Sequence, residues 1–412
     1  MGQKLGLALA GGGALGSYEV GAIEALEELG FHFDVVSGTS IGALNGAFLA
    51  SHAAKRLRPL WSNITADKVM VNGVDISKKL LTNPSLNTTK EFNKWYWTYF
   101  KNGLSADITP FKKYIKDALD VDAALNSDME FGVVTTSFPS MKLVDVNMKE
   151  VDKDKFLPFL HASSACTPIF PPEIIDGKRY IDGFFNDNLP IRLAFKLGAD
   201  EVIAIDMRLF SLKPQNRFFL TLPNVSYIAP YIPLGSMVDF SQESIQKYMK
   251  LGYLDTMKFF KKYRGFYFCF QGEIPSSGFL ADLIHEYGTD SEWILDELKK
   301  DSHWVMDEKD YFVRAMEDIA IRLDMKDYYD CFTMEEFASR LREAIKQKKA
   351  NQGFLSRTFQ SVTSDISTKR RAIKTKFLIE FGTKYLKLTT PSGRPLLTKY
   401  LLNGINKKEK EA

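Results

Sequence analysis

The sequence contains few of the residues that build disulfide frameworks and metal sites. Its 412 residues include three cysteines, Cys166, Cys269 and Cys331, and five histidines. The number of cysteines is odd, their spacing is wide and no CxxC pair occurs, which argues against a disulfide framework and against a zinc site. We therefore expect a protein of a reducing compartment. We also expect that it needs no cofactor.

Long apolar runs are also missing. No stretch approaches the roughly twenty uninterrupted apolar residues of a membrane-spanning helix. The apolar segment at residues 4–10 is shorter than a signal peptide requires, and it leads directly into glycines that the fold is expected to use. These absences predict a cytoplasmic protein, soluble or bound peripherally to the inner face of the membrane, and made without a cleaved secretion signal.

Positive charge is concentrated at one end of the chain. Residues 342–412 carry 17 Lys and Arg against 5 Asp and Glu, a net charge of +12, whereas residues 1–341 have a net charge of −9. The overall net charge of +3 therefore hides a basic tail on an acidic body. With 45% hydrophobic and 25% charged residues, the composition is otherwise that of a globular protein, which excludes a disordered or fibrous chain.

The pentapeptide GTSIG at residues 38–42 is the most informative local pattern. It follows an apolar segment at residues 33–36 and leads into a helix of small and apolar residues, so it lies where a strand turns sharply into a helix. Ser40 on such a turn has strained backbone angles and an exposed hydroxyl, and Gly38 and Gly42 avoid clashes across the turn. A loop rich in small residues is the alternative, but the strand before and the helix after favour a nucleophile elbow.

The hexapeptide GGGALG at residues 11–16 connects a predicted strand at residues 5–10 to a predicted helix at residues 17–29. It matches the GxGxxG pattern of dinucleotide-binding turns, although Asp34 lies before the end of the next strand instead of closing it near a ribose. The same geometry can form an oxyanion hole, because amides at a helix N-terminus converge on a negative oxygen. Its donors are then the backbone amides of Gly11, Gly12 and Gly13.

Asp182 ends a predicted strand and is followed by Gly183. Such a carboxylate can approach another loop without steric obstruction, and it can accept a proton if burial raises its pKa. An Asp-Gly turn on the surface is the alternative.

A Ser-acid-His triad is the competing mechanism for a serine hydrolase. Only His285 and His303 follow the acid in the chain order of an α/β-hydrolase triad, and neither has a supporting motif.

Five motifs together resemble the patatin-like phospholipases over roughly residues 5–206. They are GGGALG, GTSIG, ASSACTPIFPP, YIDGFFNDNLP and LGADEVIAID, in the family's order and approximate spacing. The resemblance implies an α/β fold of three α/β/α layers with a mostly parallel sheet, and lipid acyl-ester hydrolysis without a metal. It also implies a Ser-Asp dyad instead of a triad.

The resemblance assigns a role to each matching residue. Ser40 resembles the family's nucleophile and Asp182 its general base, while the amides of Gly11, Gly12 and Gly13 resemble its oxyanion hole. The other motif glycines are Gly16, Gly38, Gly42 and Gly183. Two positions depart from the family's pattern: Leu15 stands where many members have Lys or Arg, and Phe184 stands where DGG or DGA is usual.

We expect three parts: a catalytic domain at residues 1–210, a helical extension at residues 211–341 and a basic amphipathic tail at residues 342–412. An apolar stripe with helical spacing runs through the tail, and Lys and Arg residues border it. The stripe consists of Ile373, Phe377, Phe381, Tyr385 and Leu388. Such a helix is expected to lie on an anionic membrane surface. Docking of the stripe onto the acidic body is the alternative, and a nucleic-acid role is not expected because no binding fold accompanies the charge.

The leading hypothesis is a serine acyl hydrolase that cleaves membrane phospholipids or lysophospholipids through an acyl-enzyme. Transfer of the acyl group to another alcohol uses the same steps. The alternatives are a nucleotide-binding protein, or a catalytically idle lipid-binding protein that uses the first glycine loop. Aromatic residues between positions 92 and 100 are expected to be core side chains, with an acyl-chain channel as the less favoured interpretation.

Overall fold

The computed structural model describes residues 2–71, 106–167, 169–209, 214–300, 305–351 and 366–388. The aromatic segment at residues 92–100 lies outside these ranges. The chain forms two compact units, Met1–Thr256 and Met257–Ala412. The division falls after residue 256. The expected catalytic domain, helical extension and tail, with boundaries at residues 210 and 341, stay a prediction.

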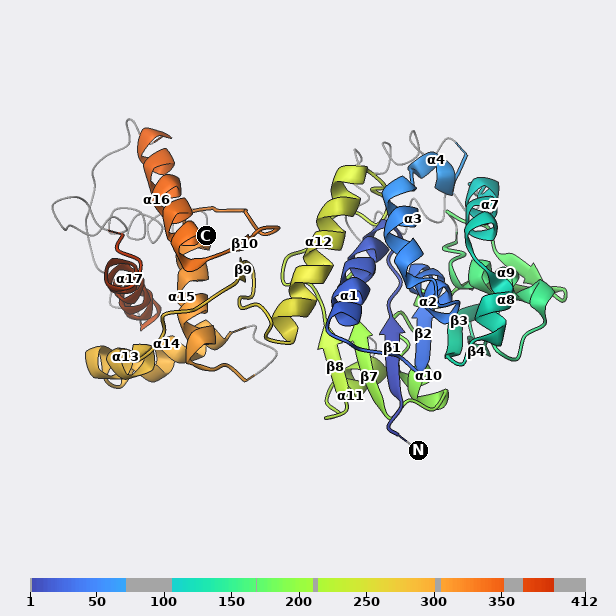
Figure 1. The fold of residues 1–412 in the computed structure, drawn as a ribbon, viewed down its shortest axis with the longest axis horizontal. Helices are drawn as coiled ribbons and strands as arrows, with labels where there is room; N and C mark the ends of the chain where they lie inside the picture. The colour runs from blue at the N-terminus through green and yellow to red at the C-terminus, as the bar shows by residue number, and fades with distance from the viewer. Residues whose placement is uncertain are drawn as a thin grey trace. The chain divides into compact units, whose positions relative to one another are not determined.

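The first unit is built on a mixed, mainly parallel sheet (Figure 1). The described strands follow the order β5-β6-β3-β2-β1-β7-β8, with β4 paired to β3. Strands β3, β2, β1, β7 and β8 run parallel to one another, and β4 and β6 run antiparallel to β3, as β5 does to β6. The bounds are β1 Leu5–Leu9, β2 Val35–Thr39, β3 Glu130–Phe138, β4 Leu143–Asn147, β5 Glu173–Ile175, β6 Lys178–Asp182, β7 Glu201–Ile205 and β8 Val225–Ile228.

Helices cover both faces of this sheet. Gly46 of helix α2 packs against Phe131 of β3, whereas the neighbouring Gly132 packs against Leu193 of helix α10. Successive strand residues point to opposite faces, so α2 and α10 lie on opposite sides of the sheet. The predicted layered α/β fold is thus confirmed. The helices of this unit are η1 Gly13–Gly16, α1 Ser17–Glu28, α2 Ile41–Ala50, η2 Ala54–Arg56, α3 Leu57–Asn63, α4 Ala66–Val69, α7 Thr109–Ala118, α8 Val121–Asn126, α9 Lys153–Ser163, η4 Gly183–Phe185, α10 Ile191–Lys196 and α11 Pro214–Phe219, with α12 Gln242–Phe259 crossing the boundary.

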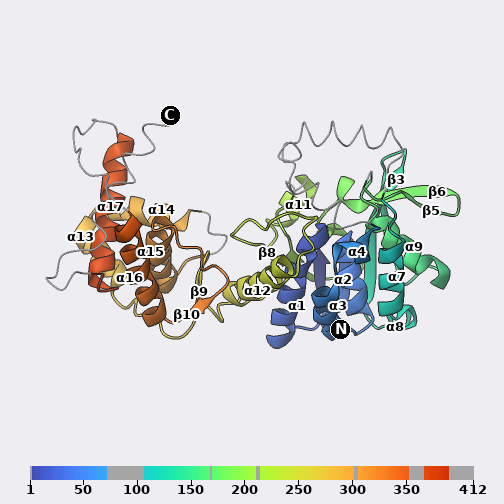
Figure 2. The same cartoon turned by 90° about the horizontal axis from the view of Figure 1, so that it is seen from above.

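The topology gathers three predicted segments at one edge of the sheet. Strands β1 and β2 are parallel and in register, so the glycine turn after β1 and Ser40 after β2 leave the sheet at the same edge. Asp182 comes from the antiparallel strand β6, where it pairs with Thr135 of β3. Thr39 pairs with Val134 of the same strand, which places the end of β6 beside the elbow. Figure 2 shows β5 and β6 as a hairpin on this unit.

The second unit is a helical bundle with its own core. Its helices are α13 Phe279–Tyr287, α14 Asp290–Lys299, α15 Glu308–Arg322, α16 Met334–Asn351 and α17 Ile366–Lys384. Two short strands, β9 Cys269–Phe270 and β10 Cys331–Phe332, pair in parallel and place Cys269 and Cys331 opposite each other. Aromatic side chains from several helices pack edge to face in the core, as Phe279, Phe312 and Phe381 do.

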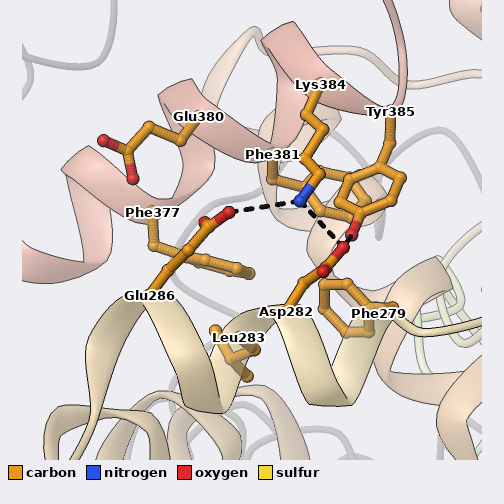
Figure 3. Close-up of a pocket in the computed structure, with 9 residues that line it drawn as sticks. All are labelled: Phe279, Asp282, Leu283, Glu286, Phe377, Glu380, Phe381, Lys384 and Tyr385. Atoms are coloured by element: carbon orange, nitrogen blue, oxygen red, sulfur yellow. Dashed lines mark hydrogen bonds and ion pairs between the residues drawn. The ribbon is translucent and has the colours of Figure 1, made fainter.

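The apolar stripe of the tail belongs to this core, which favours the docking alternative for this helix. Phe377, Phe381 and Leu388 are at most 3% exposed, because α17 packs against α15 and its neighbours. The Lys384 ammonium pairs with Asp282 Oδ2 at 2.8 Å and with Glu286 Oε1 at 3.1 Å (Figure 3). The amphipathic helix therefore docks within its own unit. Among the described helices, none is both long enough and apolar enough to cross a membrane.

Candidate active site

Ser40 occupies the sharp turn between β2 and α2. Its backbone angles, φ 55° and ψ −121°, lie in a region that residues with a Cβ rarely adopt. Such strain is typical of functional positions. A Cβ on Gly38 would come within 2.5 Å of the Ala43 nitrogen, and one on Gly42 within 2.5 Å of the Leu9 carbonyl oxygen. The two glycines are therefore required by close backbone approach, as the elbow pattern predicts.

The hydroxyl of Ser40 donates a hydrogen bond to Asp182. The Ser40 Oγ to Asp182 Oδ2 distance is 2.8 Å, and the other carboxylate oxygen accepts from the Phe184 amide at 2.9 Å. The turn after Asp182 can come this close because residue 183 is glycine: a Cβ there would lie 2.3 Å from the Val134 carbonyl oxygen. Both Asp182 oxygens thus have hydrogen-bond partners. One of these partners, the Ser40 hydroxyl, is the candidate nucleophile.

Burial controls the acidity of this carboxyl group. Asp182 is 1% exposed, and desolvation raises its pKa to about 7, with the bonds from Phe184 and Ser40 opposing part of the rise. A carboxyl group with this pKa can take a proton near neutral pH and release it again. Phe184, which departs from the family's pattern, contacts Phe185, with the two rings tilted and their centroids 4.1 Å apart.

The glycine turn after β1 differs in one detail from the expectation. The Gly11 amide donates to the Asn188 carbonyl oxygen at 3.1 Å, so it is already occupied. Within the described residues, no partner is found for the amides of Gly12 and Gly13, whereas the next amide, of Ala14, donates to the Met237 carbonyl at 2.8 Å. Two of the three expected donors are thus unoccupied beside the elbow.

Two residues that the sequence analysis quoted without assigning a role hold this arrangement in place. Ser163, at the end of α9, accepts from the Ser40 amide at 3.0 Å and donates to the Val134 carbonyl at 2.7 Å. Asn188 also donates from its side chain to the Gly11 carbonyl at 3.1 Å, so two bonds join it to the start of the glycine turn. Both lie in quoted motifs, which is the signal that could have indicated them.

An apolar pocket of about 600 Å³ opens beside Ser40. Gly13 and Ser40 form part of its wall, and most of the remaining wall is aliphatic or aromatic. Among the lining side chains are Leu44, Ile64, Met70, Phe111, Phe170 and Phe240. Such a lining fits an alkyl chain and offers few partners to a polar group.

No histidine among the described residues bonds to Ser40 or Asp182. His161 is buried beside Phe111 with ring centroids 6.3 Å apart, and burial together with Lys112 lowers its pKa to about 4. His52 contacts Ser127 and Asp128, and His303 lies outside the described residues. Within the same ranges, no group of three His, Cys, Asp or Glu side chains could hold a metal ion.

Comparison with known families gives one match over the first unit. Residues 7–195 match the model of the patatin-like phospholipases, a range that contains Ser40, Asp182 and the glycine turn. This part of the chain is a patatin-like phospholipase domain. The patatin-like domain thus covers most of the span, residues 5–206, over which the motifs indicate the family.

Fungal lysophospholipases share the patatin-like domain. The lysophospholipase nte1 of Aspergillus terreus is 29% identical over 209 residues, which are 50% of this chain and 12% of that protein. The lysophospholipase NTE1 of Pyricularia oryzae is 30% identical over 222 residues, again 50% of this chain and 12% of that protein. The chain thus matches about an eighth of the length of these relatives. Among solved structures, VipD from Legionella pneumophila is similar with 15% identity and a TM-score of 0.42, covering 97% of this chain and 90% of that chain.

Proposed function

We propose that this protein is a serine acyl hydrolase that cleaves fatty-acyl esters of membrane phospholipids or lysophospholipids. The observation that carries the proposal is the 2.8 Å hydrogen bond from the Ser40 hydroxyl to Asp182 on a strained elbow. The family match over residues 7–195 supports lipid ester chemistry, and the lysophospholipase names of the relatives support the substrate class.

The proposed reaction begins with a proton transfer. Asp182 takes the proton of the Ser40 hydroxyl while the oxygen attacks the ester carbonyl carbon, and the amides of Gly12 and Gly13 bind the resulting oxyanion. Collapse of the tetrahedral intermediate breaks the bond to the alcohol, which leaves with the proton from Asp182. Water then attacks the acyl-enzyme and gives a proton to Asp182. Collapse of the second tetrahedral intermediate releases the fatty acid, and Asp182 returns the proton to the Ser40 oxygen.

The apolar pocket supplies the binding step. Its walls around Ser40 remove an acyl chain from water, at about 0.8 kcal/mol per buried CH₂ group. Polar headgroups find few partners in this lining, so we place the headgroup at the mouth and the chain inside. An acyl transferase would use the same pocket with an alcohol in place of water.

A nucleotide-binding or idle lipid-binding protein is the competing function. A dinucleotide would place its pyrophosphate at the amides that begin the first helix. One of these amides, that of Ala14, already donates to the Met237 carbonyl, which opposes this alternative. For an idle scaffold, the Ser40–Asp182 contact would have no chemical use.

The membrane contact expected of residues 342–412 stays a prediction, as does the peripheral cytoplasmic location. The buried stripe of α17 does not support insertion of that helix. Lys374 pairs with Asp318 at 2.7 Å, and Lys384 pairs with Asp282 and Glu286. Any attraction to anionic lipid would therefore depend on the other cations of this segment, at about 1 kcal/mol each near the surface.

Labelling with a fluorophosphonate probe tests the proposed function. The wild-type chain should be labelled on Ser40 and should release fatty acid from phospholipid or lysophospholipid in a defined panel that also contains triacylglycerol. Ser40→Ala should lose both labelling and hydrolysis while its circular dichroism and melting temperature stay the same, because one hydroxyl carries the covalent step. An unlabelled wild-type protein that binds lipid without hydrolysing it would establish the scaffold alternative.

A further inference from the structure

Asn45 lies inside helix α2, five residues after Ser40, with its side chain 1% exposed. Its amide nitrogen donates to the Gly16 carbonyl oxygen at 3.1 Å and to Glu19 Oε2 at 2.8 Å. Its amide oxygen accepts from the indole nitrogen of Trp61 at 3.0 Å. Both hydrogens of the NH₂ group and the carbonyl oxygen therefore have partners, which is close to the full capacity of an asparagine.

These partners belong to the segments that surround the candidate oxyanion hole. Gly16 ends the glycine turn that begins at Gly11, and Glu19 lies in the first turn of α1. A Cβ on Gly16 would come within 2.6 Å of Ile41 Cγ1, so the beginnings of α1 and α2 are in direct contact. Asn45 thus joins the helix that carries the nucleophile to the segment that carries the free amides.

Burying these polar groups lowers the folding stability, which an apolar contact at the same place would not do. Glu19 is fully buried, and desolvation raises its pKa well above the ordinary value, although bonds from Asn45 and the Ala10 backbone oppose the rise. Asp206 raises the pKa further. Burial therefore favours the neutral form of this carboxyl group, and its Oε1 has no partner among the described residues. Burying a polar group with an unpaired oxygen destabilises a fold, whereas directional bonds select one packing arrangement of the two helices.

We propose that Asn45 is a positioning residue for acyl transfer: with Glu19 and Trp61 it holds the Gly12 and Gly13 amides at the distance from Ser40 Oγ that the oxyanion requires. The inference rests on the proposed function. Oxyanion donors act within a narrow range of distances, and a misplacement of about 1 Å can lower the rate on the order of a hundredfold. Asn45 contacts neither the pocket nor the reacting atoms, so its loss should affect the turnover number more than binding.

The test compares one variant within α2 and one at the residue that follows it. Asn45→Ala removes the three bonds, and we expect kcat to fall roughly tenfold to a hundredfold while KM changes by no more than about threefold. Ser51→Ala is the matched control: Ser51 is a buried polar residue that follows α2, and its hydroxyl donates to the Phe48 carbonyl at 3.0 Å. This control should keep wild-type kcat, because its bond lies at the other end of the helix.

Conservative variants separate positioning from folding. Glu19→Gln keeps an acceptor for Asn45 in a neutral side chain and should retain most of the activity, whereas Glu19→Leu removes the acceptor and should lower kcat as Asn45→Ala does. Trp61→Phe removes the N–H donor together with part of the buried indole ring. It keeps the test decisive if Asn45→Ala does not fold, and we expect a smaller loss of kcat with unchanged KM.

The outcomes distinguish the inference from the proposed function. A wild-type protein without hydrolysis or probe labelling overturns both. An active wild type together with a folded Asn45→Ala of unchanged kcat overturns the positioning role alone, and so does a loss confined to KM. Equal loss in Glu19→Gln and Glu19→Leu would likewise show that the hydrogen bond to Asn45 is not what matters.

Discussion

The Ser40 hydroxyl and the Asp182 carboxylate meet across 2.8 Å although the two residues are 142 positions apart in the sequence. Strand pairing produces this contact: Asp182 pairs with Thr135 on β3, and Thr39 pairs with the preceding residue, Val134. The contact is therefore part of the sheet, and it does not depend on a mobile loop. Its consequences can be measured.

Asp182→Asn should abolish most of the activity. An amide cannot accept the serine proton, so we expect a loss of roughly a hundredfold to ten-thousandfold in kcat, approaching that of Ser40→Ala. His161→Gln serves as the control because His161 is the buried histidine of the same unit. It should retain substantial activity, since the carboxylate takes the proton directly. Loss of activity in a folded His161→Gln, or in His285→Ala or His303→Ala, would favour a triad.

The pH dependence should follow the carboxyl group. Burial raises the pKa of Asp182 to about 7, and only the ionised form can act as base. We expect kcat/KM to rise with pH by about tenfold per unit below this pKa and to level off above it. Initial rates on a soluble short-chain ester between pH 5 and pH 9 measure the profile. A midpoint near pH 4 would contradict the burial argument.

The same group should make folding stability depend on pH. Its folded pKa is raised from 3.8 to about 7, so the folded state holds a proton that the unfolded state has already released. The contribution of Asp182 is fully present below pH 3.8 and is lost as the pH rises to about 7. Relative to the wild type, the melting temperature of Asp182→Asn should therefore increase between these values and then stay level. A constant difference at every pH would contradict the shift.

Much of the site was predictable because its signals are local. The elbow and the Asp-Gly turn are set by glycines that the backbone requires within a few residues, so a short motif reports them. The contacts of Asn188 with Gly11 and of Ser163 with Ser40 join residues 177 and 123 positions apart, and no local pattern encodes them. For the same reason, the spacing of Cys269 and Cys331 did not indicate that they face each other on β9 and β10.

Periodicity predicted the helix of the tail but not what covers its apolar face. A capping box begins α16, with the Thr333 amide donating to Glu336 Oε2 at 2.8 Å and the Glu336 amide donating to Thr333 Oγ1 at 3.3 Å. An apolar stripe such as that of α17 fits a membrane surface as well as a protein core, because each only requires one apolar side. The cations that border the stripe do not distinguish the two, since a cation can pair with a lipid phosphate or with a carboxylate such as Asp282 or Glu286.

The glycine turn should respond to substitutions at its two unoccupied amides. A Cβ at Gly12 would meet the flexible end of Met207 at 2.7 Å, whereas one at Gly13 would meet the backbone oxygen of Met237 at 2.4 Å. Gly13 also has a φ of 58°, which disfavours any side chain. Gly12→Ala should therefore fold and lower kcat by about a hundredfold with little change in KM, as expected for a displaced oxyanion donor. Gly13→Ala should also lower the melting temperature. Loss of saturable dinucleotide binding in Gly12→Ala would instead support the nucleotide alternative.

The last prediction concerns the stripe of α17. Phe381 is 2% exposed, and its ring lies 4.9 Å from that of Phe312 and 5.5 Å from that of Phe279. Phe381→Ala should therefore destabilise the second unit by about 3–5 kcal/mol, through lost burial and the cavity that remains.

The exposed Lys376 of the same helix provides the control, because Lys376→Ala should change the free energy of unfolding by no more than about 0.5 kcal/mol. Urea unfolding of the full chain measures both variants, and sedimentation with anionic vesicles at low and high salt separates the two roles of the helix. If Phe381→Ala kept wild-type stability but bound vesicles more weakly, the result would support membrane binding by the stripe.

Truncation after residue 341 should remove part of the second unit's core. We therefore expect the truncation to unfold that unit and not merely to weaken binding to vesicles.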